Sequence, residues 1–196
     1  DLPRDEQGLC LIAAPRRLEQ SETIVHELPA LLDSAMAHFD AIVANTGANW
    51  GEQHAVLLER SSRALFLVDQ RASSLRACKH AVELCARCGI AASPFLFVAN
   101  RCSKRSLFSS IDVSCAMQGA HAAELKDGGV EVEQALGTGL AYDLVSSRNA
   151  FAQSVRELMG EVVGEAAGSL ASSEESEAPS RGLFSFRRAR REGVLP

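Results

Sequence analysis

Residues 63–100 read RALFLVDQRASSLRACKHAVELCARCGIAASPFLFVAN. They contain two continuous apolar runs, Ala64–Val68 and Phe95–Ala99, on either side of a stretch with helical spacing. Continuous apolar runs are typical of strands that are buried on both faces. The stretch between them, Ser74–Cys88, begins with serine N-cap signals and stops at Gly89. This order predicts two parallel strands joined by a right-handed helical crossover.

The same alternation extends outward on both sides of this unit. Two further apolar runs, Gly8–Ala14 and Phe39–Ala44, lie upstream and are expected to be strands. Helical spacing follows each of these runs, over Ile24–Ala35 and over Glu52–Ser61. Downstream we expect, in chain order, a short helix, a weak edge strand, a second short helix and a long helix: Ser109–Gln118, His121–Leu125, Val130–Leu136 and Asn149–Val163. The alternation predicts an α/β domain built on a parallel sheet.

Length and composition fit one globular domain. The chain has 196 residues, of which 46% are hydrophobic and 23% are charged, and its net charge is −5. A chain of this size can bury a sizeable core, and its negative charge gives no reason to expect nucleic-acid binding. No apolar run reaches the roughly 20 residues that span a bilayer. Because no secretory signal pattern opens the sequence, we expect a cytoplasmic protein.

The spacing of cysteines and histidines does not predict a metal site. Cys85-x-x-Cys88 has no second pair of ligands, so the six cysteines are expected to be small buried side chains in a reducing cytoplasm. The five histidines are scattered and are expected on helix surfaces. We expect Trp50 to pack against the end of the sheet. Asp112 and Glu124 are lone carboxylates with no evident partner in the sequence.

The composition changes near residue 164, which divides the chain into a folded domain, residues 1–164, and a C-terminal segment, residues 165–196. Glu165–Ser180 is rich in Ser, Ala and Glu and is expected to be a disordered acidic linker. A basic-aromatic tail follows, and its candidates for contact with an anionic membrane or an acidic partner are Leu183, Phe184, Phe186, Arg187 and Arg188. The alternative is a solvated, unstructured end.

Two of the apolar runs end in the same tripeptide, Val-Ala-Asn, at residues 43–45 and 98–100. In an open parallel sheet, ligands bind just outside the carboxyl ends of the strands. Asn45 and Asn100 are therefore the first candidates for a binding site. The alternative for Asn100 is a cap on the loop that follows its strand.

In order and spacing, several segments resemble the MinD/ParA family of deviant P-loop ATPases, and especially its CpaE/TadZ-like branch, which takes part in pilus assembly. The segments that carry the resemblance are GLCLIAAPRRLEQSETI, FDAIVANTG, RALFLVDQRASSLRACKHAVEL, FLFVANR and GGVEVEQALGTGLAYDLVSSRNAF. They lie within residues 8–163. The resemblance implies a Rossmann-like, three-layer domain of the P-loop NTPase type that is incomplete at its N-terminus in this chain.

The resemblance also implies nucleotide-binding roles. Asn100 corresponds to the family's Asn that contacts the adenine edge, and an amide suits this task because it both donates and accepts hydrogen bonds. Asp143 corresponds to a residue that the family places near the base. The intact family binds ATP and Mg²⁺, dimerises across its nucleotide face and helps to localise its machinery at the membrane. The implied partners are therefore pilus or secretion assembly proteins and a second copy of the chain.

Two departures from the family pattern argue against ordinary ATP hydrolysis. The family's P-loop, a Gly-rich turn with two lysines, lies upstream of the region that this chain covers, and no GKT or GKS occurs in it. Without that turn, little remains to bind the β- and γ-phosphates. Asn45 stands where the family has an Asp near Mg²⁺, and an amide brings no negative charge to the ion. We therefore assign no catalytic residue and leave open whether this chain keeps ATP or Mg²⁺.

Three functions remain open from the sequence. The leading one is a MinD/ParA-like positioning protein with impaired or absent hydrolysis, acting in the cytoplasm or at the inner face of the cell membrane. The second is a scaffold of the same fold that works without nucleotide. The third is an unrelated Rossmann-like enzyme, which ranks last because the sequence contains no evident acid–base or nucleophile constellation.

Overall fold

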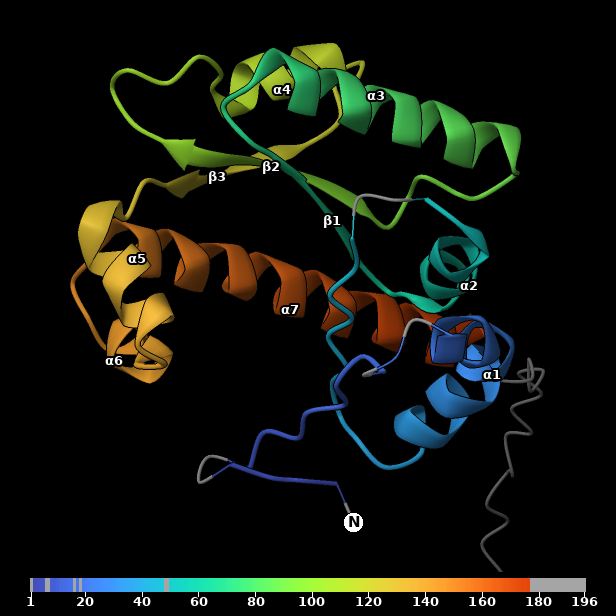
Figure 1. Cartoon of the computed structure of the whole chain (residues 1–196). Helices are drawn as coiled ribbons and strands as arrows, with labels where there is room; N and C mark the ends of the chain where they lie inside the picture. Colours follow the sequence, from blue (N-terminus) through green and yellow to red (C-terminus); the bar gives the residue numbers. More distant parts are fainter. Residues whose placement is uncertain (1, 6–7, 16, 18, 48–49, 177–196) are drawn as a thin grey trace, which may run out of the picture.

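The computed structural model describes residues 2–5, 8–15, 17, 19–47 and 50–176, without the side chains of 21–22 and 165–176. In chain order its elements are α1 (Glu19–Met36), α2 (Glu52–Arg60), β1 (Ala64–Val68), α3 (Ala72–Arg87), β2 (Phe95–Cys102), α4 (Ser110–Ala116), β3 (Ala122–Lys126), α5 (Gly129–Gly137), α6 (Ala141–Val145) and α7 (Ala150–Ser176). Figure 1 shows α3 and α4 on one side of the sheet and α7 on the other.

The three strands form a parallel sheet in the order β1-β2-β3. Ala64 pairs with Phe95 and Phe97 with Ala122, so β2 is the central strand. The layers of helix, sheet and helix match a Rossmann-like P-loop NTPase-type fold, as the sequence predicts (Figure 1). The carboxyl ends of β1, β2 and β3 consequently lie along one edge of the sheet.

The helix between β1 and β2 forms where its signals predict, but it begins two residues earlier. Its N-cap is Arg71, while the Ser74 hydroxyl accepts a hydrogen bond from the Asp69 amide at 2.9 Å. That bond ties the end of β1 to the first turn of α3. At the other end Gly89 adopts φ 75°, a left-handed conformation that glycine adopts without steric cost.

Alternate residues of β2 supply the two faces of the core, as expected for a strand covered on both sides. Facing α3 and α4 is a cluster of Val68, Cys78, Phe97, Ala99, Cys102, Val113 and Met117. Facing α7 is a smaller cluster of Leu96, Val98, Leu125 and Leu158. The sheet is therefore held between two apolar layers, and its polar residues gather at the strand ends.

Two of the strands expected from the sequence do not form. Residues 8–14 make only one isolated antiparallel bridge, between Arg4 and Cys10, and residues 39–44 are in no strand. The side chain of Val43 is 90% exposed. An apolar run becomes a strand only where a neighbouring strand pairs with it and helices cover it, and within the described residues neither run has that environment.

The outer side of β1 is also uncovered. Leu65 pairs with Leu96 and Leu67 with Val98, so both leucines lie on the face that α7 covers over β2. They remain 42% and 57% exposed, because α7 packs against β3 and β2 and leaves β1 open. Within the described residues, β1 forms a ladder with β2 alone.

The last helix differs from expectation in its length. α7 continues to Ser176, so the backbone of residues 165–176 is helical where a disordered linker is expected. The Ala and Glu residues of this stretch are strong helix formers. The predicted domain boundary at residue 164 stays a prediction, and residues 177–196 lie outside the described residues. In the part of the chain that the structure describes, no helix has the length and apolar character to cross a membrane.

Candidate functional site

The candidate site lies at the carboxyl end of β2, where Asn100 is half-buried. The ladder between β2 and β3 slips at this point: Ala99 pairs with Glu124, but the next pair is Cys102 with Lys126. Two residues of β2, Asn100 and Arg101, therefore lie opposite one residue of β3, Leu125, which defines a bulge. Arg101 within it has φ 55°, in the left-handed region that a non-glycine residue rarely adopts.

The bulge turns the backbone carbonyl of Asn100 toward the side chain of Gln70, the second residue after β1. The Gln70 Nε2 donates to the Asn100 carbonyl at 2.8 Å and to the Phe108 carbonyl at 3.1 Å. The Gln70 Oε1 accepts from the Phe108 amide at 2.9 Å. One side chain thus connects the end of β1, the bulge of β2 and residue 108. We name these contacts the Gln70 clamp.

Sequence reasoning missed Gln70, although a signal was available. The residue stands just beyond the carboxyl end of a predicted strand, the position that singled out Asn100. What the sequence does not reveal is the bulge, which frees a carbonyl for the glutamine. Within the described residues, the hydrogen bond of Asn100 to another side chain is made by its backbone carbonyl, and its side-chain amide makes none.

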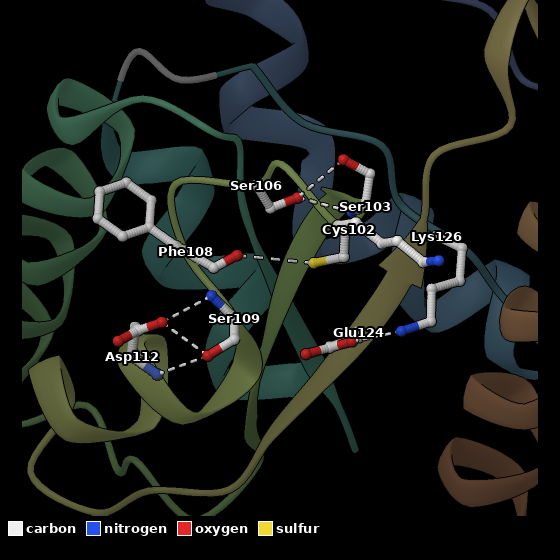
Figure 2. Close-up of a pocket in the computed structure, with 9 residues that line it drawn as sticks. Cys102, Ser103, Ser106, Phe108, Ser109, Asp112, Glu124 and Lys126 are labelled. Atoms are coloured by element: carbon white, nitrogen blue, oxygen red, sulfur yellow. Dashed lines mark hydrogen bonds and ion pairs between the residues drawn. The ribbon is translucent and has the colours of Figure 1, made fainter.

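A pocket of about 460 Å³ lies beside the clamp, where β2 and β3 end and α4 begins (Figure 2). Most of the residues that line it have polar or charged side chains; the lining consists of Cys102, Ser103, Lys104, Ser106, Phe108, Ser109, Asp112, Glu124 and Lys126. Residues 103–106 are held in a tight turn by the Ser106 hydroxyl, which accepts from the Ser103 amide at 2.6 Å. None of these residues was a site candidate from the sequence.

The two carboxylates of the pocket have partners, contrary to the expectation that they stand alone. Glu124 pairs with Lys126 and accepts two hydrogen bonds from Ser110. The Lys126 ammonium is the main cause that lowers the pKa of Glu124, and in return Glu124 raises the pKa of Lys126. Asp112 forms a capping box with Ser109, the N-cap of α4, and the hydrogen bonds that it accepts from Ser109 lower its pKa. All three side chains are therefore charged at neutral pH.

The cysteines divide between the core and the surface. Cys78, Cys85 and Cys102 are buried as expected, whereas Cys88 and Cys115 are exposed. Burial raises the pKa of Cys78 to about 11 and also raises that of Cys102, so both are thiols at neutral pH. Within the described residues, no group of three His, Cys, Asp or Glu side chains is placed to hold a metal ion.

The structure does not bring the other two nucleotide-site candidates into contact with Asn100. Asn45 is exposed and follows the run that forms no strand, so it does not lie at a strand end. Asp143 is exposed in the first turn of α6. An ion pair of Arg101 with Glu133 of α5, at 2.9 Å, joins the bulge to the helix that precedes α6. The tail candidates, residues 183–188, lie outside the described residues.

The segment after Asn45 is fixed by a histidine that was expected on the surface. His54 is only 6% exposed; its Nδ1 accepts from the Gly51 amide at 3.3 Å, and its Nε2 lies 3.0 Å from the Gly47 carbonyl. Because Nδ1 accepts, Nε2 carries the proton and donates. Trp50 stacks on His54 and on Phe66 of β1, which agrees with the prediction that it packs against the sheet.

Comparison with known proteins gives the class of fold. No family model and no curated protein matches the chain. Among solved structures, it resembles the crystal structure of a ParA family ATPase from Chlorobium tepidum TLS, with a TM-score of 0.71 and 17% sequence identity. The similarity covers 80% of this chain and 66% of the other. The chain thus has a ParA-like fold and spans slightly less than two thirds of the length of that structure.

Proposed function

We propose that this protein is a MinD/ParA-like nucleotide-binding protein in which Asn100 reads the base. The observation that carries the proposal is the Asn100 amide, which is half-buried at the carboxyl end of the central strand and has no hydrogen-bond partner within the described residues. An amide can donate to one atom of an adenine edge and accept from another. The ParA-like fold supports a ligand at this edge of the sheet.

The residues present fit only the base end of such a ligand. Asn45 offers no negative charge for Mg²⁺, and residues 1–196 contain no GKT or GKS. We therefore propose that this chain by itself hydrolyses ATP weakly or not at all.

The finer role that we propose is that of a CpaE/TadZ-like positioning protein, which localises pilus or secretion machinery at the inner face of the membrane. The order of its sequence segments supports this role, and so does the basic-aromatic tail at residues 181–191. Dimerisation with a second copy belongs to the same proposal. A scaffold that uses the fold without nucleotide is the competing function, and the exposed apolar side chains of Val43, Leu65 and Leu67 favour it.

Titration with a fluorescent adenine nucleotide tests the proposal, with and without Mg²⁺. We expect measurable binding to the wild-type chain, a loss of about tenfold in affinity for Asn100→Ala, and little dependence on Mg²⁺. Asn45→Ala is the matched control, because it removes an exposed amide of the same kind. Binding that is equal for wild type and Asn100→Ala would reject the base contact, and no binding to any of the proteins would favour the scaffold.

A further inference from the structure

The backbone around Asn100 is in a conformation that needs support. Arg101 has φ 55°, and left-handed conformations of non-glycine residues persist only where the surroundings hold them. Bulges of this kind commonly re-aim a side chain near a site. The Ser106 hydroxyl donates to the Arg101 carbonyl at 3.3 Å. Two further interactions hold the bulge: the Arg101 guanidinium pairs with Glu133, and the Asn100 carbonyl accepts from Gln70.

These two supports differ in character. The Arg101–Glu133 pair joins two side chains that are 56% and 64% exposed, so it contributes little free energy to holding the bulge. The Gln70 contacts are partly buried and use both ends of the amide. A carbonyl that loses its partner in such a place costs more free energy than the bond itself contributes. The Gln70 clamp is therefore the stronger of these two supports.

We propose that Gln70 is the positioning residue of the base-reading site. It holds the bulge of β2 in the one conformation that presents the Asn100 amide, and it fixes the backbone of Phe108 at the wall of the adjoining pocket. This inference rests on the proposed function of Asn100. Gln70 itself contacts no base; it acts through the backbone of the residue that does.

The chemistry of the clamp makes glutamate a conditional substitute. Ionised glutamate only accepts hydrogen bonds. In Gln70→Glu the carboxylate can still accept from the Phe108 amide, but it cannot donate to the carbonyl oxygens of Asn100 and Phe108. Protonation of the carboxylate in this variant restores one O–H group that can donate to one of the two carbonyls. Because the charged form is disfavoured beside two carbonyls, the pKa of the new carboxyl lies above the ordinary value. Gln70→Glu should thus bind nucleotide poorly at pH 8 and recover at pH 5.5, whereas Gln70→Met should stay weak at both.

The other ionisable groups near the clamp keep their charge state between pH 5.5 and pH 8, because burial raises the pKa of Cys102 and a hydrogen bond from Arg71 lowers that of Asp69. These groups are the Cys102 thiol, 3.6 Å from Gln70 Nε2, and the neighbouring ion pair of Asp69 with Arg71. Wild type is measured at each pH as the reference. Gln153→Glu serves as the matched control, since Gln153 is exposed on α7 and makes one hydrogen bond, to the Arg148 carbonyl. Thermal unfolding at both pH values identifies a variant that does not fold.

The test measures affinity for ATP and for GTP on wild type, Asn100→Ala, both Gln70 variants and the control. We expect the Gln70→Glu preference for ATP to fall about tenfold at pH 8 and to return at pH 5.5, with the control unchanged. If Asn100→Ala loses the preference while Gln70→Glu and Gln70→Met keep it, the positioning role is wrong and the base contact stands. The positioning role is also wrong if Gln70→Glu loses affinity equally for ATP and GTP at pH 8 and does not regain it at pH 5.5. If Asn100→Ala binds like wild type, the proposed function fails, and the role of Gln70 falls with it.

Discussion

Gln70 and Phe108, 38 residues apart in the sequence, exchange two hydrogen bonds in which a side-chain amide pairs with the backbone N–H and C=O of one residue. The same glutamine donates to the carbonyl of Asn100. The pairing joins the ends of β1 and β2 to Phe108, which lines the pocket that Figure 2 shows at the carboxyl edge of the sheet. The residues that we assign to nucleotide recognition are thereby parts of one hydrogen-bonded unit.

The segment between Asn45 and α2 should depend on His54. In His54→Ala the Gly47 carbonyl and the Gly51 amide lose their partner, and Trp50 loses a stacked ring. We expect a loss of about 1–3 kcal/mol in the free energy of unfolding. Trp50 is the single tryptophan of the chain, so its emission should shift to the red and be quenched more strongly by acrylamide. His80→Ala, at a side chain that is 70% exposed, is the control, and equal quenching of the two variants would contradict the role of His54.

Acid should remove the stability that Glu124 contributes. Its pKa is lowered in the folded protein, mainly by Lys126, so its contribution is present above the ordinary value of 4.5 and is lost as the pH falls below it. In Glu124→Gln the free energy of unfolding should drop by about 0.5 kcal/mol at pH 7, a small value because the pair is partly exposed.

Urea unfolding between pH 7 and pH 3 measures this difference. The gap between wild type and Glu124→Gln should close toward pH 3. Glu59→Gln, at an exposed position on α2, is the matched control. A gap that stays constant over the whole range would show that the charge of Glu124 does not carry the effect.

The strands β1 and β2 should respond differently to a charge placed on the same face of the sheet. Leu67 is 57% exposed, so Leu67→Lys should change the free energy of unfolding by no more than about 0.5 kcal/mol. Leu96, on the same face and 4% exposed, should not tolerate lysine, because an unpaired charge would be buried against α7. Chemical denaturation of both variants checks this. Equal destabilisation by the two substitutions would mean that another element covers β1.

The basic-aromatic tail should bind anionic lipid. Deleting residues 181–196 removes its arginines together with Leu183, Phe184 and Phe186. We expect the full chain to co-sediment with vesicles that contain phosphatidylserine and the truncated chain to stay in the supernatant, since basic residues and apolar side chains act together at such surfaces. Vesicles of phosphatidylcholine alone are the control. Equal pelleting of both chains would reject the membrane contact.

The central strand–helix–strand unit could be predicted from the sequence because its signals are local. Ala64–Val68 and Phe95–Ala99 are continuous apolar runs, and the helix between them ends at a glycine. The runs at residues 8–14 and 39–44 carry the same local signal and form no strand. Strand formation also requires a pairing partner, and the identity of that partner is not encoded within the run itself.

The candidate site was predictable only in part, for a related reason. The position of Asn100 at a strand end follows from the strand itself. The Gln70 clamp does not, because its hydrogen bonds span 30 and 38 residues and depend on a bulge that no motif announces. His54 was placed on a surface because helical spacing alone does not show that its ring nitrogens satisfy two backbone groups of the preceding segment.

The ratio of ATP to GTP affinity, measured by competition against a fluorescent adenine nucleotide, tests the central claim most directly. The claim is that the Asn100 amide reads the base. We predict that the wild-type chain prefers ATP by about tenfold, as one well-placed pair of hydrogen bonds allows, and that Asn100→Ala binds both nucleotides equally. A preference for ATP that survives unchanged in Asn100→Ala would contradict it.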